Sequence, residues 1–129
     1  MTNKEITIEN VISTLTHFEF NPSNQAEKSS LKVDFGTTFK KIDESHVMVG
    51  LEAIIGDKKE SPVFCHVRYQ GQLAMENYEE DADDKRYLEE TACATFYPYI
   101  RSTVARLFSD AGLPPFQMPI LPIANLLKK

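Results

Sequence analysis

Several residue types are scarce in this chain, and each scarcity excludes a class of site. The 129 residues contain no tryptophan and only two cysteines, Cys65 and Cys93, which lie far apart without CxxC spacing. We expect two buried, reduced thiols, because neither a disulfide framework nor a cysteine metal site has the residues it needs. The histidines His17, His46 and His66 are scattered and have no further ligands at metal-binding spacing, so we expect no metal site.

Charge and hydropathy exclude two further classes of partner. The net charge is −5 and no basic cluster occurs, so we expect no nucleic-acid partner. No apolar run approaches the roughly 20 residues that span a bilayer, so we expect no membrane insertion. The first ten residues lack the apolar core of a signal peptide, which favours a cytoplasmic location. The length suits one domain, residues 1–129.

Catalytic signatures are also missing. The chain has no G-x-S-x-G, no P-loop and no G-x-G-x-x-G. Cys65 and His66 are neighbours on an expected strand, so they point to opposite faces and cannot act as nucleophile and base. The acidic residues 79–84 are interpreted as a solvated loop that caps a helix. We therefore expect a protein that is not an enzyme and uses no cofactor.

Alternating apolar residues predict a β-sheet in the first half of the chain. Strands are expected at residues 5–20, 31–42, 47–55 and 63–76, with short links between the later ones. The alternation in the first strand slips near Glu9 and Asn10, which predicts a bulge or kink. Gly71 predicts a bend or close backbone approach. The pattern predicts a four-stranded antiparallel meander with one buried face.

Helical periodicity follows the acidic run. Leu88, Ala92 and Phe96 share one face, and Pro98 then either kinks this helix or begins another. After Pro98, a second set of apolar residues occurs at helical spacing: Ile100, Val104, Leu107, Phe108 and Ala111. Gly112 suits the left-handed position after a helix, and Pro114 and Pro115 prevent its continuation.

The segment after this helix is apolar where an ordinary surface loop would be polar. Leu113, Phe116, Met118, Ile120 and Leu121 occur within nine positions. Two interpretations remain open: a segment that packs flat over the core, or one wall of a groove for apolar partners. Aromatic and methionine side chains suit the second interpretation because they repack at low cost around different ligands.

The order of these features resembles the SecB family of bacterial export chaperones. The resemblance rests on Phe18-Glu19 at the end of the first strand, on the strand 31–35 and on the Phe64-Cys65-His66-Val67 motif. It continues through the helix containing Phe96, Pro98, Tyr99 and Arg101, and through the crossover 114–123, which precedes Asn125-Leu126-Leu127. The chain is most similar to a group of uncharacterised Gram-positive proteins with a SecB-like fold and shortened ends.

The resemblance implies an α+β fold, in which a long helix and a short C-terminal helix pack on one face of a four-stranded antiparallel sheet. It implies an ATP-independent holdase that binds unfolded or precursor polypeptides, with a link to protein export. The implied peptide-binding groove comprises Leu73, Tyr78, Leu113, Phe116, Met118, Ile120 and Leu121. A homodimer or tetramer is implied, with an interface at Leu88, Ala92, Ile100, Val104, Leu107 and Phe108.

The SecA motor is a further implied partner: Glu19 occupies a matching surface position, and Asp57 a loosely matching one. An alternative is a regulatory or interaction protein with the same fold, whose crossover is packed shut and which binds one dedicated partner. An open apolar groove beside residues 113–121 would favour the holdase. Full burial of Phe116 and Met118 would favour the dedicated partner.

Overall fold

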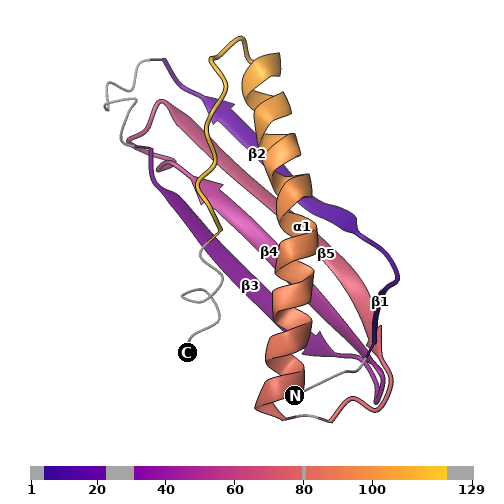
Figure 1. The fold of residues 1–129 in the computed structure, drawn as a ribbon. Coiled ribbons are helices and arrows are strands. Elements are labelled where there is room, and N and C mark those ends of the chain that lie inside the picture. Colours follow the sequence, from indigo (N-terminus) through magenta and orange to yellow (C-terminus); the bar gives the residue numbers. More distant parts are fainter. Residues whose placement is uncertain (1–4, 23–30, 80, 122–129) are drawn as a thin grey trace.

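The computed structural model describes residues 5–22, 31–79 and 81–121 and shows one sheet with one long helix on a single face (Figure 1). The strands are β1 (Ile6–Ile8), β2 (Ile12–Phe20), β3 (Val33–Lys41), β4 (His46–Ile55) and β5 (Val63–Met75). The helix α1 follows as Ala82–Asp110. Among the described residues, no helix is long and apolar enough to cross a membrane.

The antiparallel sheet confirms the α+β fold and corrects two details of the prediction. It has five strands, because the predicted first strand is divided into β1 and β2, which both pair with β5. The division falls at residues 9–11, where the alternation slips, and a bulge follows at Ser13–Leu15. The meander holds only for β3, β4 and β5, because β1 and β2 lie beside β5, at the opposite edge from β3.

The core lies between the sheet and α1. Alternate residues of the two central strands point at the helix and are buried, such as Val49 and Leu51 on β4 and Cys65 and Val67 on β5. The helix packs against these strands through buried residues that recur every three or four positions, including Leu88, Phe96 and Ile100. The alternating apolar residues of the strands and the periodic apolar residues of the helix therefore pack together in one core.

Pro98 does not begin a second helix, because α1 is one continuous helix. Its 29 residues run through Pro98, which lies inside α1. Two carboxylates fix its start: the N-cap Asp81 accepts from the Asp84 backbone N–H at 2.8 Å, and the buried Asp84 accepts from the Glu79 N–H at 2.8 Å. The acidic run thus caps the helix, as its sequence predicts. The predicted C-terminal helix falls at residues 122–129, outside the described part of the chain.

Candidate functional site

From here on, the crossover means residues 113–121, the part of this segment that the structure describes. It begins at a well-defined helix end. Gly112 has a φ of 78°, and its N–H donates to the Ser109 carbonyl at 3.0 Å. The Leu113 N–H donates to the Phe108 carbonyl at 2.9 Å. These two bonds form a Schellman motif, which turns the chain back toward the sheet. The crossover then returns beside α1 over the same face of the sheet (Figure 1).

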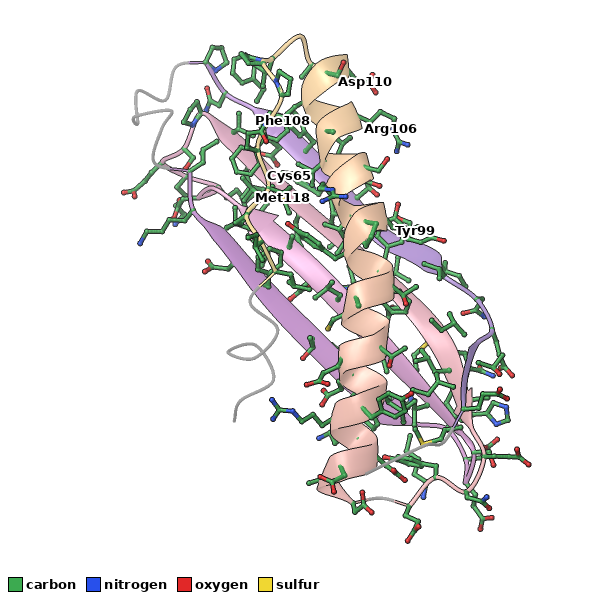
Figure 2. All side chains as sticks on the ribbon, in the orientation of Figure 1. Cys65, Tyr99, Arg106, Phe108, Asp110 and Met118 are labelled. Atoms are coloured by element: carbon green, nitrogen blue, oxygen red, sulfur yellow. The ribbon has the colours of Figure 1, made fainter. Side chains whose placement is uncertain are left out.

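Three aromatic rings hold the first half of the crossover. The Phe116 ring stacks on Phe108 with centroids 5.3 Å apart, and Phe18 of β2 meets Phe108 edge-on at 5.4 Å. Phe108 is only 4% exposed, whereas Phe116 is partly exposed. Figure 2 shows Phe108 and Met118 on the side of α1 where the crossover runs, with Tyr99 and Arg106 on the other side. Phe116 therefore packs on Phe108 with one part of its side chain and leaves another part exposed to solvent.

A pocket of about 220 Å³ opens beside this stack, which we call the proximal pocket. No charged side chain among the described residues lines it, so an apolar ligand would leave none of their charges unpaired there. Its walls come from the end of β2, the start of β5, the end of α1 and the crossover: Phe20, Leu31, Pro62, Val63, Phe108, Leu113, Pro114, Pro115 and Phe116.

A second pocket of about 350 Å³, the distal pocket, lies where the other half of the crossover meets α1. The Tyr97 hydroxyl donates to the Pro119 carbonyl, and the Arg101 guanidinium lies 5.9 Å from the Tyr97 ring centroid. Burial raises the pKa of Tyr97, and Arg101 partly opposes this effect, so the hydroxyl stays protonated as a donor. Leu121 is 9% exposed and anchors the crossover, while Ile120 is 92% exposed.

The structure gathers five of the seven predicted groove residues. Leu113 and Phe116 line the proximal pocket, and Met118, Ile120 and Leu121 line the distal pocket. Leu73 lies in the core with no exposed surface, because it faces α1 from β5. Tyr78 follows β5 near the start of α1, beside a polar pocket at the other end of the sheet, so neither residue joins the crossover.

Three further walls of the proximal pocket, next to β2, β3 and β5, are not apparent from the sequence. Phe20 and Leu31 flank residues 21–30, and Pro62 precedes β5. An exposed phenylalanine at the end of a strand was the available signal, since Phe20 is 47% exposed. Its proximity to the crossover could not be inferred, because it depends on β2 pairing with β5 rather than with β3.

The residues predicted for an oligomer interface lie mainly inside this chain's own core. Their exposed fractions leave no free surface for a second subunit: Leu88, Ala92, Ile100 and Val104 are at 0% and Phe108 is at 4%. Leu107 is partly buried against the same core. These side chains face the sheet, so a subunit contact on α1 would use its outward face away from the distal pocket, where residues such as Ser102 and Ala105 are exposed.

Both residues predicted for a SecA contact already have intramolecular partners. The Glu19 carboxylate lies 2.6 Å from the His17 ring and 4.0 Å from the Lys58 ammonium. The Asp57 carboxylate accepts from the Lys59 N–H at 2.8 Å and the Glu60 N–H at 3.1 Å, and so closes the β4–β5 turn. They sit at one end of the sheet but do not form a concentrated acidic patch.

The outer face of the sheet carries a compact charged cluster. The Glu52 carboxylate lies 2.8 Å from the His66 ring and 3.3 Å from Arg68. Burial raises the pKa of Glu52, but the hydrogen bonds and charges of His66 and Arg68 outweigh this effect and lower it. The cluster is a satisfied cross-strand ion pair. Within residues 5–22, 31–79 and 81–121, no group of three potential ligands could hold a metal ion.

Comparison with known proteins shows which family the sequence matches. The family model described as preprotein translocase subunit SecB matches residues 4–127. The protein-export protein SecB of Anaplasma phagocytophilum is 26% identical over 89 residues, which cover 67% of this chain and 54% of that protein. SecB of Anaplasma marginale is 26% identical over 78 residues, or 60% of this chain and 43% of that protein. The chain thus spans about half the length of these curated relatives.

Two solved structures share the fold. A SecB-like chaperone of Mycobacterium tuberculosis, in complex with a ChAD peptide from the HigA1 antitoxin, superposes with a TM-score of 0.70 at 18% identity. The match covers 90% of this chain and 87% of that one. A protein of unknown function from Streptococcus agalactiae gives a TM-score of 0.62 at 12% identity, covering 92% of this chain and all of that one.

Proposed function

Because the chain belongs to the SecB family, we propose that it is an ATP-independent holdase that binds unfolded or apolar polypeptide segments along the crossover. One observation carries the proposal: an apolar crossover lies half-buried between two pockets instead of packing shut. Phe116 and Met118 are partly exposed, and Ile120 is almost fully exposed. A protein without apolar ligands would gain stability by burying these side chains.

The composition of the pockets determines which segments they would accept. The described residues of the proximal pocket offer apolar and proline surface, and its volume of about 220 Å³ suits one large aliphatic or aromatic side chain. Burial of apolar area contributes roughly 25 cal/mol per Å² and does not depend on sequence order. A client would therefore be selected for apolar content and extended conformation, rather than for a motif.

The fold likeness to a chaperone that was solved with a bound peptide supports polypeptides as the ligand class. We further propose a cytoplasmic homodimer or tetramer, with subunit contacts on the outward face of α1. A link to export through SecA is the furthest extension of this proposal. Glu19 and Asp57 would then have to exchange their present partners for contacts with SecA.

A dedicated partner is the second candidate, and one contact favours it. The bond from the Tyr97 hydroxyl to the Pro119 carbonyl ties the crossover to α1 and restricts its movement. A restricted crossover suits one defined ligand better than many. General holdase activity requires the crossover to accept different apolar segments.

An aggregation assay distinguishes the two candidates. The purified protein is mixed at stoichiometric ratios with a reduced, aggregation-prone client, with and without ATP. A holdase suppresses light scattering equally in both conditions and loses this effect in Phe116→Asp. If the folded protein leaves aggregation unchanged, the holdase proposal fails and the dedicated partner remains.

A further inference from the structure

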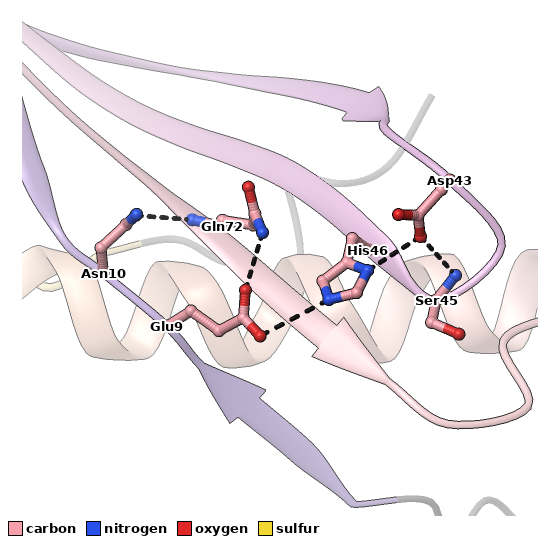
Figure 3. A network of polar contacts seen from close by, with 6 residues as sticks. All are labelled: Glu9, Asn10, Asp43, Ser45, His46 and Gln72. Carbon is pink, nitrogen blue, oxygen red and sulfur yellow. Dashed lines mark hydrogen bonds and ion pairs between the residues drawn. The ribbon is translucent and has the colours of Figure 1, made fainter.

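A polar network joins the β1–β2 link, the β3–β4 turn with the first residue of β4, and β5 (Figure 3). It lies at the end of the sheet opposite the proximal pocket. His46 begins β4, Asp43 lies in the β3–β4 turn, and Glu9 lies in the link between β1 and β2. The His46 Nδ1 is 2.8 Å from the Asp43 carboxylate, and its Nε2 is 3.5 Å from the Glu9 carboxylate. We call these three residues the His46 clasp. None of them contributes to the crossover pockets.

The β1–β2 link, which contains Glu9, packs closely against β5 and is hydrogen-bonded to it. The Glu9 N–H donates to the Gln72 carbonyl at 2.8 Å, and the Gln72 side-chain amide donates to the Glu9 carboxylate at 2.7 Å. The Gln72 N–H donates to the Asn10 side-chain oxygen at 2.9 Å. A Cβ on Gly71 would lie 2.3 Å from the Asn10 carbonyl oxygen, so only glycine admits the link this close to the strand. The β1–β2 link therefore depends on a few specific contacts.

The clasp is complete in only one protonation state. A neutral imidazole carries one N–H, so it can donate to Asp43 or to Glu9 but not to both. An imidazolium donates from both nitrogens and carries a positive charge between two carboxylates. Proton loss leaves a ring lone pair facing a carboxylate and breaks one arm of the bridge.

We propose that the His46 clasp is a proton-dependent latch that holds the short edge strand β1 against β5. With His46 protonated, the β1–β2 link is tied through the ring to the β3–β4 turn, and β1 covers the edge of β5 at residues 73–75. With His46 neutral, β1 opens more often and exposes that edge. An unpaired strand edge is a template for pairing with another chain, so the latch would govern access to β5.

The charges around the ring agree with the direction of this effect. The hydrogen bond that the His46 ring donates to Asp43 raises the pKa of His46 above its ordinary 6.5; desolvation opposes the rise, and the charges of Asp43 and Glu9 reinforce it. The Ser45 N–H and His46 lower the pKa of Asp43 below 3.8. Other charged residues on the packed elements near the ring are Glu5 before β1, Lys40 and Lys41 at the end of β3, Glu44 in the turn and Glu76 just after β5, whereas β5 itself contributes neutral Gln72 and Ala74.

The sign follows from these directions. A raised histidine pKa gives stabilisation that is complete below 6.5 and is lost as pH rises through the folded value. A lowered aspartate pKa gives stabilisation that is lost as pH falls through its folded value, below 3.8. The latch is therefore closed in mildly acidic solution and opens as pH rises through the raised pKa of His46.

Amide hydrogen exchange tests the latch directly. The Glu9 amide reports on the link because it donates to β5, and the Gly56 amide, which donates to the Lys32 carbonyl at 2.9 Å, serves as a reference at the other end of the sheet. After division by intrinsic exchange rates, the Glu9 protection factor should fall about two- to fivefold from pH 5.5 to pH 8.5, the range of an exposed ion pair. Gly56 should show no such change.

Two variants separate the latch from a general pH effect. In His46→Gln, Glu9 protection should no longer change with pH. In Glu9→Gln, the amide can still accept from Gln72, but the carboxylate arm is gone, and the His46 pKa measured by NMR should fall. An equal pH dependence in wild type and His46→Gln would overturn the proposal, as would a flat wild-type profile. Both variants alter partly exposed side chains, so loss of the fold is not expected.

Discussion

Replacing Phe116 with aspartate separates the binding role of the crossover from its packing role. Removing a fully buried phenylalanine costs about 3–5 kcal/mol, and Phe116 is only partly buried. The stacking of Phe116 on Phe108 accounts for about 0.5–1.5 kcal/mol of the cost in a partly exposed site. We expect a total loss of about 2 kcal/mol in the free energy of unfolding. A domain with about 5–15 kcal/mol of stability, the usual range, would remain folded.

The effect on client binding should be larger. Phe116 forms a wall of the proximal pocket, where no described lining residue is charged, so an aspartate in its place would put an unpaired carboxylate against the bound apolar segment. An aromatic anchor at the centre of an interface contributes about 2 kcal/mol or more, which corresponds to roughly a 30-fold rise in Kd. Fluorescence anisotropy of a labelled unfolded peptide would measure this change, with urea denaturation run in parallel.

A matched control makes the result specific. Ile42 is 46% exposed and lies just after β3, at the opposite end of the sheet from the proximal pocket. Ile42→Asp introduces the same charge on an exposed apolar residue and should leave Kd unchanged. Equal affinity in wild type and a folded Phe116→Asp would refute the groove assignment. Unfolding of Phe116→Asp would also refute it, because Phe116 would then belong to the core.

Three further predictions address packing and chemistry. Gly71→Ala should lower the free energy of unfolding by about 3 kcal/mol in urea, because the new Cβ would lie 2.3 Å from the Asn10 carbonyl oxygen and 2.8 Å from the Phe96 ring; an unchanged midpoint would contradict the close approach. Burial raises the pKa of Cys65 to about 11, and burial with the charges of Glu89 and Glu90 raises that of Cys93 to about 12, so neither thiol should react with a thiol reagent at pH 8 until the chain unfolds. Rapid labelling of the folded protein would show that the core opens. Pro98→Ala should restore an N–H inside α1 and raise the free energy of unfolding by about 1–3 kcal/mol; a loss of stability would mean that the proline ring packs as part of the distal pocket.

Local patterns in the sequence were sufficient to predict most of the elements. The alternation of apolar residues predicted β3, β4 and β5, and its slip at Glu9–Asn10 predicted the place where the first strand is divided. Gly112 predicted the left-handed turn that begins the crossover. Each of these signals depends on residues within a few positions of one another.

Features that depend on tertiary contacts were not predicted. Pro98 left a kink and a new helix open, and the new helix is excluded: α1 continues because its buried face on both sides of the proline packs against the same sheet. The pairing of β2 with β5, rather than with β3, could not be derived from strand patterns alone. That pairing brings Phe20 to the proximal pocket, whereas Leu73 and Tyr78, taken from the family resemblance, lie elsewhere.

Chemical-shift mapping of the amides tests the central claim most directly. The 15N-labelled protein is titrated with a stoichiometric unlabelled client that remains unfolded, and shift changes are followed along the chain. We predict changes concentrated at residues 113–121, Phe20 and Val63, which surround the two pockets. Changes confined to the outer face of the sheet around Glu52, or no changes with a client that binds by other assays, would contradict binding at the crossover.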